Sequence, residues 1–443
     1  MSKPTAKQIS ATTPASQRER FAWCMYDFAN SGFTTVVLTA VFNAYFVGVV
    51  AADLSTDQNA HATLLWTIAM AVANGLVLIC APILGAIADH SAAKKRFLIF
   101  TTVGCILFTA LLSLVGPGDI VLGMTLVILA TIMFSTGESL IAAFLPEITS
   151  PEQMGRLSGY GWSIGYLGGL LTLGLCIIYI DWAQAQGYSP QDFVPTTNLI
   201  VAVIFALAAL PTLLWLKERA IAMNSLSPRG YIKKGFTRLR HTFKNARQHQ
   251  DLFRFLLSLT TYHAGINTVI VLAAIYAQEV MHFTTKDTLL LIMVVNITAA
   301  IGALVFGHLQ DRIGSKTSLI LTLIIWIIAI GIIYSATETA TFWLAANLIG
   351  IALGASQSAG RAMVGQFAPP QRSGEFFGLW GLAVRLAAII GPLTYGATIY
   401  LMQGNHRLAI LSTLLFFILG LILLLTVNEQ RGKQAALQDH WNG

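Results

Sequence analysis

Charged side chains are scarce in this chain. Asp, Glu, Lys and Arg make up 11% of the 443 residues, whereas hydrophobic residues make up 55%, and the mean hydropathy is +0.68. A water-soluble protein of this length needs more polar side chains to cover its surface. The composition therefore excludes a soluble globular protein and predicts a membrane protein.

Other absences narrow the function. The phosphate-binding pattern G-x-x-x-x-G-K-[ST] does not occur, so ATP is not expected to supply energy. Neither a nucleophile motif nor a His/Glu metal cluster occurs, which argues against a membrane enzyme, a bound metal or a cofactor. Cysteines are few, lie in apolar stretches without metal-ligand spacing, and are expected to be packing residues: Cys24, Cys80, Cys105 and Cys176.

Long hydrophobic segments fill most of the chain. A helix of roughly 20 apolar residues spans the hydrocarbon core of a bilayer. Six such segments precede the polar stretch that begins at Lys217, at residues 20–50, 62–88, 96–116, 119–145, 152–180 and 194–216. Six more follow, at residues 252–280, 287–309, 316–336, 339–367, 373–402 and 405–427. The sequence predicts an all-α integral membrane protein with twelve transmembrane helices in two six-helix halves.

The polar stretch from Lys217 to Arg254 is strongly basic and divides the chain into residues 1–216, 217–250 and 251–443. Hydrophobic residues recur within it at helical spacing, which predicts a helix lying on an anionic membrane surface: Ile232, Phe236, Leu239 and Phe243. A solvated linker is the alternative. Nucleic acid is not an expected partner, because cytoplasmic loops of membrane proteins are basic for topological reasons.

Basic residues also indicate the orientation. Of those between the spans, all but Lys286 and Arg407 fall on the side of the termini, so both termini are expected in the cytoplasm. The first twenty residues are polar and no cleavable hydrophobic segment follows, so a signal peptide is not expected. Short loops and small termini are typical of prokaryotic proteins, which favours an inner (cell) membrane. A monomer is the expected oligomeric state.

The two halves resemble each other, as in many secondary transporters. Gly85-Ala-Ile-Ala-Asp89 follows the second span, and Gly307-His-Leu-Gln-Asp311-Arg312 follows the eighth. Before the fifth span stand Pro151, Gly155 and Gly159, which recur 219 residues later as Pro370, Gly374 and Gly378. Two matches at nearly the same offset indicate an internal repeat.

These features resemble the major facilitator superfamily. Its loop signature G-x-x-x-D-R/K-x-G-x-R/K is matched by Gly307 to Lys316, and less well by Gly85 to Arg96, where His90 stands at the basic position. Trp23 to Phe33 and Ser158 to Gly169 are similar to the vacuole-effluxer-like branch, named for autophagic amino-acid exporters. The resemblance covers essentially the whole chain and implies alternating access around a central site.

Four spans carry polar residues at helical spacing, and polar groups in a bilayer normally face a cavity or a partner. The first carries Asp27, Asn30, Ser31 and Thr34, and the fourth carries Thr131, Ser135, Glu138 and Ser139. The seventh carries Thr260, His263 and Asn267, and the tenth carries Asn347, Gln357, Ser358 and Arg361. The family resemblance implies that spans 1, 4, 7 and 10 line the central cavity.

Charged groups within the spans are the main functional candidates. An ionised acid near mid-bilayer costs about 2.5–3.5 kcal/mol, so Asp27 and Glu138 are expected either to carry a proton or to pair with an arginine. Arg385 needs an anion, which a substrate carboxylate or phosphate or Glu138 could supply. Arg361 has the further alternative of reaching the headgroups. The predicted substrate and proton site comprises Asp27, Asn30, Glu138, His263, Asn267, Gln357, Arg361 and Arg385, with a packing role as the alternative for His263.

The loop motifs predict a latch between the halves. The resemblance implies that Asp89 and Asp311 each face the positive N-terminus of a helix in the other half, with the neighbouring basic residues paired to acids. The predicted latch residues are Gly85, Asp89, Gly307, Asp311 and Arg312. The alternative is that these charged residues only set the orientation of the chain in the membrane.

Together these patterns predict a secondary transporter, not an enzyme. The expected activity is proton-coupled export of amino acids or related small polar metabolites, with the substrate class implied by the resemblance. Alternatives are transport of another organic anion, a drug or a metal chelate, or a receptor or scaffold that does not transport. Expected partners are a small-molecule substrate, protons and membrane lipids.

Overall fold

The computed structural model describes residues 15–52, 58–219, 249–403 and 406–441. Within these ranges the regular structure is entirely helical. The interfacial helix predicted within residues 217–250 falls on residues 220–248, outside the described ranges.

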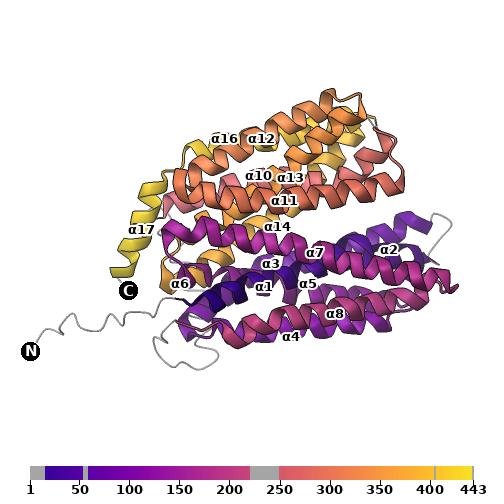
Figure 1. Cartoon of the computed structure of the whole chain (residues 1–443), viewed down its shortest axis with the longest axis horizontal. Helices are drawn as coiled ribbons and strands as arrows, with labels where there is room; N and C mark the ends of the chain where they lie inside the picture. The colour runs from indigo at the N-terminus through magenta and orange to yellow at the C-terminus, as the bar shows by residue number, and fades with distance from the viewer. Residues whose placement is uncertain (1–14, 53–57, 220–248, 404–405, 442–443) are drawn as a thin grey trace, which may run out of the picture.

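Twelve long helical segments make up the described chain, labelled as in Figure 1. The first half contains α1 (Gln17–Gly32) continued to Val50, α3 (Gln58–Ser91), α4 (Lys94–Leu111), α5 (Ile120–Ala142), α7 (Met154–Ala185) and α8 (Pro190–Trp215). The second contains α10 (Gln250–Glu279), α11 (Thr285–Ile313), α12 (Ser315–Ser335), α13 (Thr339–Phe367), α14 (Ser373–Leu401) and α16 (Leu411–Leu425). Shorter helices are α2 (Phe42–Tyr45), α6 (Leu145–Ile148), α15 (His406–Ala409) and the terminal α17 (Glu429–Trp441).

The segment after α1 departs from regular α-helix. Phe33–Ala40 and Phe46–Val50 form π-helical turns on either side of α2. Wider π turns often occur at functional sites. No feature of the sequence pattern predicted this change.

Lipid-facing surfaces are apparent on the outer helices. Large apolar side chains there are exposed, among them Ile79, Phe100, Ile178 and Leu207. Eleven helices in the described ranges are long and apolar enough to cross a membrane. The twelfth long helix, α10, packs between α14 and α16. The chain is thus a multi-pass membrane protein, as its composition predicted.

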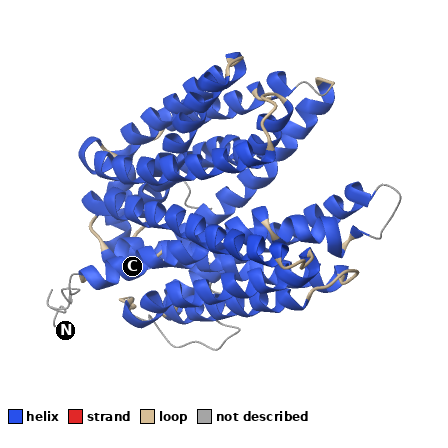
Figure 2. Ribbon diagram, turned by 45° about the vertical axis from the view of Figure 1, so that its right-hand side comes forward, coloured by secondary structure: helices blue, strands red, loops and turns tan. Residues whose placement is uncertain are grey.

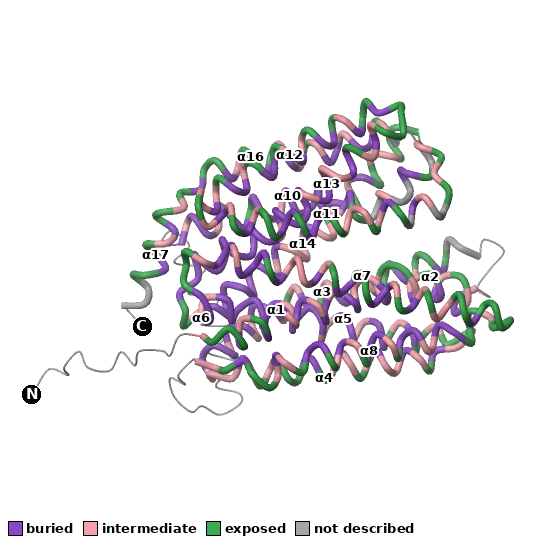
Figure 3. Tube along the Cα trace, viewed as in Figure 1, coloured by how far each residue is buried: buried purple, intermediate pink, exposed green. Residues whose placement is uncertain are grey.

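The two halves meet at the end of the molecule that carries both termini and diverge toward the other end (Figures 1 and 2). Between the halves, α7 packs against α11 and α3 packs against α14. Buried residues gather near this junction, whereas exposed residues follow the outer helices (Figure 3). The junction therefore closes the molecule on the side of the termini.

Repeated glycines allow these close contacts. A Cβ atom at Gly85 would lie 2.0 Å from the Gly374 carbonyl oxygen, and one at Gly159 would lie 2.5 Å from the Ala303 carbonyl oxygen. A Cβ at Gly307 would lie 2.8 Å from the Gly155 carbonyl oxygen. The sequence repeat thus marks two matching helix contacts between the halves, which only glycine permits at these distances.

Candidate functional site

One cavity of about 440 Å³ lies between the halves, and side chains from both line it. All eight residues predicted for the substrate and proton site lie in its lining: Asp27, Asn30, Glu138, His263, Asn267, Gln357, Arg361 and Arg385. The lining continues through Tyr276 and Tyr395 toward the end of the molecule away from the termini.

Asp27 of α1 and Arg361 of α13 form an ion pair across the two halves. Arg361 Nη1 lies 2.8 Å from Asp27 Oδ2 and 3.0 Å from Oδ1. Arg361 is only 3% exposed and Asp27 9% exposed. The alternative that Arg361 reaches the headgroups is wrong, because its guanidinium turns inward to a carboxylate.

The Arg361 guanidinium is held on every side. Its Nε donates to Ser158 Oγ at 3.1 Å and its Nη2 to the Ser158 carbonyl at 3.0 Å. Its Cζ lies 4.5 Å from the ring centre of Trp23 and 5.3 Å from that of Trp162, within cation–π range. This enclosure fixes the charge at the closed end of the cavity.

Gly161 of α7 makes room for this pair. A Cβ atom there would lie 2.3 Å from Asp27 Oδ2 and 2.6 Å from Arg361 Nη2. Gly165 and Gly169 lie on the same face, against Ser31 of α1. The small-residue stripe of the fifth span therefore packs α7 against α1 and admits the pair between them.

A second ion pair joins the halves within the cavity. Arg385 Nη2 of α14 lies 2.8 Å from Glu138 Oε2 of α5. The side chains of Arg385 and Glu138 are 15% and 26% exposed, more than those of the Asp27 pair. Of the partners considered for Arg385, the structure therefore shows Glu138, with the pair open to the cavity.

Some residues of the polar stripes do not reach the cavity. Among the residues of the fourth span's stripe, only Glu138 lines the cavity. Ser139, Thr260 and Asn347 donate to backbone carbonyls of their own helices instead. The hydroxyls of Thr131, Ser135 and Ser358 are buried outside the cavity lining, without a hydrogen-bond partner among the described residues. Hydroxyl groups often bond within their own helix, so helical spacing alone does not separate the two roles.

Apart from Asp27 Oδ2, which lies in the ion pair, two buried polar atoms of cavity-lining residues lack a hydrogen-bond partner among the described residues. They are Asn30 Oδ1, in a residue only 6% exposed, and Trp162 Nε1. A buried acceptor and a buried donor left unpaired are costly in an apolar setting. Each atom therefore leaves one hydrogen-bonding group unsatisfied beside the cavity. Within the described ranges, no group of His, Cys, Asp and Glu is placed to hold a metal ion.

The sequence did not predict the aromatic lining. Trp162, Tyr166, Trp326 and Trp380 all line the cavity. Aromatic residues are common in the apolar spans, so their number gave no signal. The Trp162 and Tyr166 spacing, i and i+4 within a polar-rich motif, is the one pattern that could have indicated them.

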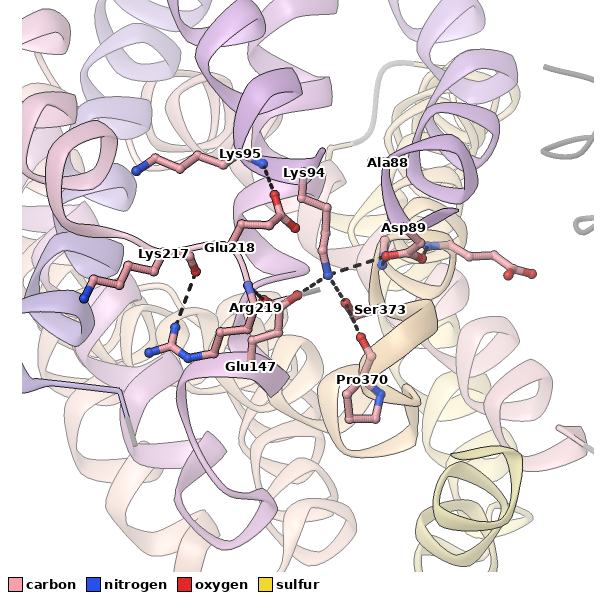
Figure 4. Close-up of polar contacts among 12 residues, drawn as sticks. Ala88, Asp89, Lys94, Lys95, Glu147, Lys217, Glu218, Arg219, Pro370 and Ser373 are labelled. Carbon is pink, nitrogen blue, oxygen red and sulfur yellow. Dashed lines mark hydrogen bonds and ion pairs between the residues drawn. The ribbon is translucent and has the colours of Figure 1, made fainter. Parts of the chain in front are cut away.

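The first loop motif lies at the closed junction, where Asp89 meets the N-terminus of α14. Asp89 accepts hydrogen bonds from the backbone N–H of Gly374 at 2.9 Å and of Glu375 at 2.8 Å. Lys94 is fully buried beside it, with Nζ 3.5 Å from Asp89 Oδ1 and 2.9 Å from Ser373 Oγ, and it also pairs with Glu147 (Figure 4). Lys94 thus supplies the positive charge beside Asp89, whereas His90 occupies the motif position directly after Asp89.

The second loop motif makes the matching contact with α7. Asp311 Oδ2 accepts a hydrogen bond from the Arg156 backbone N–H at 3.2 Å. The neighbouring contacts are neutral: Gln310 Nε2 donates to Ser315 Oγ, and Gln366 Nε2 donates to the Pro151 carbonyl. Arg312 is exposed and forms no ion pair with any residue that the structure describes. The two junctions share geometry but differ in charge.

The turns after the two motifs also correspond. Gly314 has φ +89° between α11 and α12, and Ala92 has φ +47° at the matching place between α3 and α4. This left-handed region favours glycine, and an alanine there is strained. The first copy makes the same turn, although alanine stands where the second copy has glycine.

Sequence and structure comparisons agree with this architecture. The family described as "Vacuole effluxer Atg22 like" matches residues 15–437. The uncharacterised MFS-type transporter YxiO of Bacillus subtilis is 28% identical over 96% of this chain and 98% of its own length. Autophagy-related protein 22 of Yarrowia lipolytica is 24% identical, and the match covers 68% of this chain and 55% of that protein.

Solved structures show the same fold at low identity. The human organic anion transporter MFSD10 has a TM-score of 0.72 at 15% identity, covering 93% of this chain and all of that one. The proton:xylose symporter XylE has a TM-score of 0.72 at 16% identity, covering 96% and 98%. The fold is that of the major facilitator superfamily, and the chain belongs to the Atg22-like vacuole effluxer family of transporters within it.

Proposed function

We propose that this chain is a proton-coupled exporter of amino acids or related small polar metabolites, acting as a monomer in the cell membrane by alternating access. The observation that carries the proposal is the pair of acid–arginine contacts in one cavity, Asp27 with Arg361 and Glu138 with Arg385. Each acid belongs to the first half and each arginine to the second.

This division of charge suits a zwitterion. A substrate carboxylate can take the place of Glu138 at Arg385, and an ammonium group can take the place of Arg385 at Glu138. Because the two charges come from different halves, one molecule that binds both bridges the halves. The aromatic and aliphatic remainder of the lining accommodates an apolar side chain.

Proton coupling is assigned to the same pair. Glu138 can accept a proton only when Arg385 releases it, because the ion pair favours the carboxylate. A substrate ammonium group at Glu138 also favours the ionised carboxylate, so substrate and proton compete for Glu138, and this competition links the two events. Asp27, enclosed with Arg361 at the junction, serves instead as a gate residue on the side of the termini.

We assign the side of the termini to the cytoplasm, in keeping with the basic residues that gather there. The junction of Asp89 with α14 and of Asp311 with α7 then closes the cytoplasmic side. The cavity, whose lining extends the other way, is accordingly in an outward-facing state, and transport requires these junctions to open.

Replacing Arg385 with alanine is expected to weaken substrate binding about 10- to 100-fold, the loss of one charge-assisted hydrogen bond. Thermal stabilisation of the purified protein by amino acids, dipeptides, organic acids and metal chelates measures this. Arg96→Ala, which removes an exposed arginine outside the cavity, should bind as the unchanged protein does. Stabilisation by organic acids or chelates but not by amino acids would contradict the proposed amino-acid substrate and identify the other class as the substrate. A complete absence of stabilisation would favour a scaffold.

Replacing Glu138 with glutamine is expected to uncouple substrate movement from protons. In proteoliposomes with a pH-sensitive dye inside, a substrate gradient should drive proton flux through the unchanged protein but not through the variant, whose amide cannot carry a proton. Exposed Glu338→Gln is the control. Proton flux that survives Glu138→Gln but not Asp27→Asn would identify Asp27 as the proton carrier. Absence of proton flux through the unchanged protein as well as the variant would contradict proton coupling.

A further inference from the structure

A basic hollow lies on the side of the termini, outside the central cavity. It is formed where α10, α12, α16 and α17 meet, and its basic lining residues are Arg254, Lys316, Arg431 and Lys433. Glu429 is the one acid in its lining within the described part of the chain. The proposed transport cycle assigns no role to this hollow.

Two of the four cations are already neutralised. Lys433 Nζ lies 2.6 Å from Glu429 Oε1, and Arg431 Nη2 lies 2.8 Å from Oδ1 of the buried Asp251. The Arg431 contact joins α17 to α10, whereas the Lys433 contact lies within α17. These two side chains therefore add little net charge to the hollow.

The other two cations have only carbonyl partners among the described residues. Arg254 Nη1 lies 3.3 Å from the Thr426 carbonyl oxygen. Lys316 Nζ lies 2.9 Å from the Leu425 carbonyl oxygen and 2.7 Å from that of Val427. These carbonyls belong to the C-terminal end of α16, which attracts cations through partial charges only. Neither Arg254 nor Lys316 therefore forms an ion pair with a carboxylate of the described residues, and Asp251, one turn from Arg254, is already paired with Arg431.

Glu429 does not cancel these two positive charges. Its carboxylate accepts hydrogen bonds from the backbone N–H of Ser315 at 3.2 Å and of Lys316 at 2.9 Å, which cap α12. Burial disfavours its charge, but Lys433 and these amides outweigh burial and lower the pKa of Glu429. Its negative charge is thus taken up by α12 and Lys433. Glu218 makes the matching contact in the first half, with the Lys95 backbone N–H at 2.7 Å.

Exposed apolar side chains border the hollow. Leu425 is part of its lining and is 56% exposed, and Ile422 lies one turn earlier on α16 at 53%. On α10, Leu257 follows Arg254 and is 57% exposed, and on α12, Leu321 follows Thr317 and is 40% exposed. Each points away from the protein core on a membrane helix. The hollow therefore lies where the apolar belt meets the polar end of the helices.

We propose that this hollow binds an anionic phospholipid, with the lipid phosphate between Arg254 and Lys316 and the acyl chains against Leu257, Leu321 and Ile422. Basic pockets between membrane helices on this side are suited to anionic headgroups. Charge-assisted hydrogen bonds to phosphate oxygens supply the affinity. The bound lipid links α10 to α12 beside the α17 contacts, and so stabilises the terminal helix on the second half.

The test is native mass spectrometry of the whole purified protein with phosphatidylglycerol. Removing a basic residue near an anionic lipid is expected to weaken binding about fivefold, so the double variant Arg254→Gln, Lys316→Gln should bind the first lipid about thirtyfold more weakly. Arg96→Gln, an exposed arginine at the start of α4 in the other half, should bind it as the unchanged protein does.

Three outcomes would overturn the proposal. Equal retention of phosphatidylglycerol by the double variant and the unchanged protein would show that the lipid binds elsewhere. Equal retention of phosphatidylcholine would show that the hollow does not select charge. Stabilisation by inorganic phosphate as strong as that by phosphatidylglycerol, measured by thermal unfolding, would make the ligand a soluble anion. Arg254→Lys with Lys316→Arg keeps both charges and should retain the lipid, which separates lost charge from misfolding.

Discussion

Replacing Arg361 with methionine is expected to abolish transport and to lower the free energy of unfolding by about 3–5 kcal/mol. The change leaves the carboxylate of Asp27, only 9% exposed, without its partner in the closed end of the cavity. It also removes the two hydrogen bonds to Ser158 that join α13 to α7. Uptake into proteoliposomes and thermal unfolding in detergent measure the two effects.

The double variant Asp27→Asn, Arg361→Met separates a gate from a fixed ion pair. Because no uncompensated charge is left in the double variant, stability should recover most of the loss. Transport should remain lost if the pair must form and break in each cycle. Full transport by the double variant would show that the pair only holds the helices together. Arg312→Met removes an exposed arginine of the same half and should leave unfolding unchanged.

Replacing Gly85 with alanine is expected to reduce transport about 10- to 100-fold by preventing closure of the junction. A Cβ there would lie 2.0 Å from the Gly374 carbonyl oxygen, so α3 and α14 must separate. Overpacking of a tight contact costs about 1–3 kcal/mol, which here falls on the closed state alone. The population should shift toward molecules open on the side of the termini.

Alkylation of a cysteine introduced at Ser373 reports this shift. Ser373 is fully buried in the closed junction, so a membrane-impermeant reagent should label it faster in the Gly85→Ala background. Gly75→Ala lies on the same helix, where a Cβ meets nothing within 4 Å, and should transport and label as the unchanged protein does. Equal labelling in both backgrounds would contradict a closed junction built on Gly85.

The sequence predicted the helices well because the bilayer imposes a length and a composition on each span. It also predicted polar cavity residues, since a polar group such as Asn30 or His263 in a span needs a cavity or a partner. It could not assign Arg361 to Asp27 or Arg385 to Glu138, because helix rotation decides which side chains face each other across 334 and 247 residues. A structural or functional role for each pair therefore stayed open.

Other features left no pattern in the sequence. Lys94 appeared as one of three adjacent basic residues, yet it alone is fully buried and joins Glu147 to Asp89. The terminal helix α17 is too polar to be recognised as a span, and it is held by Glu429 and Arg431 contacts to distant segments. Tertiary contacts, which sequence periodicity does not record, determine both.

The charges of the cavity determine how the membrane potential acts on transport. Two carboxylates and two guanidinium groups sum to zero, so the empty carrier reorients without moving net charge through the field. A zwitterionic substrate adds none. One bound proton adds a full charge, worth about 2.3 kcal/mol for each 100 mV that it crosses. Voltage should therefore drive only the protonated step, and the current per substrate molecule should count the protons directly.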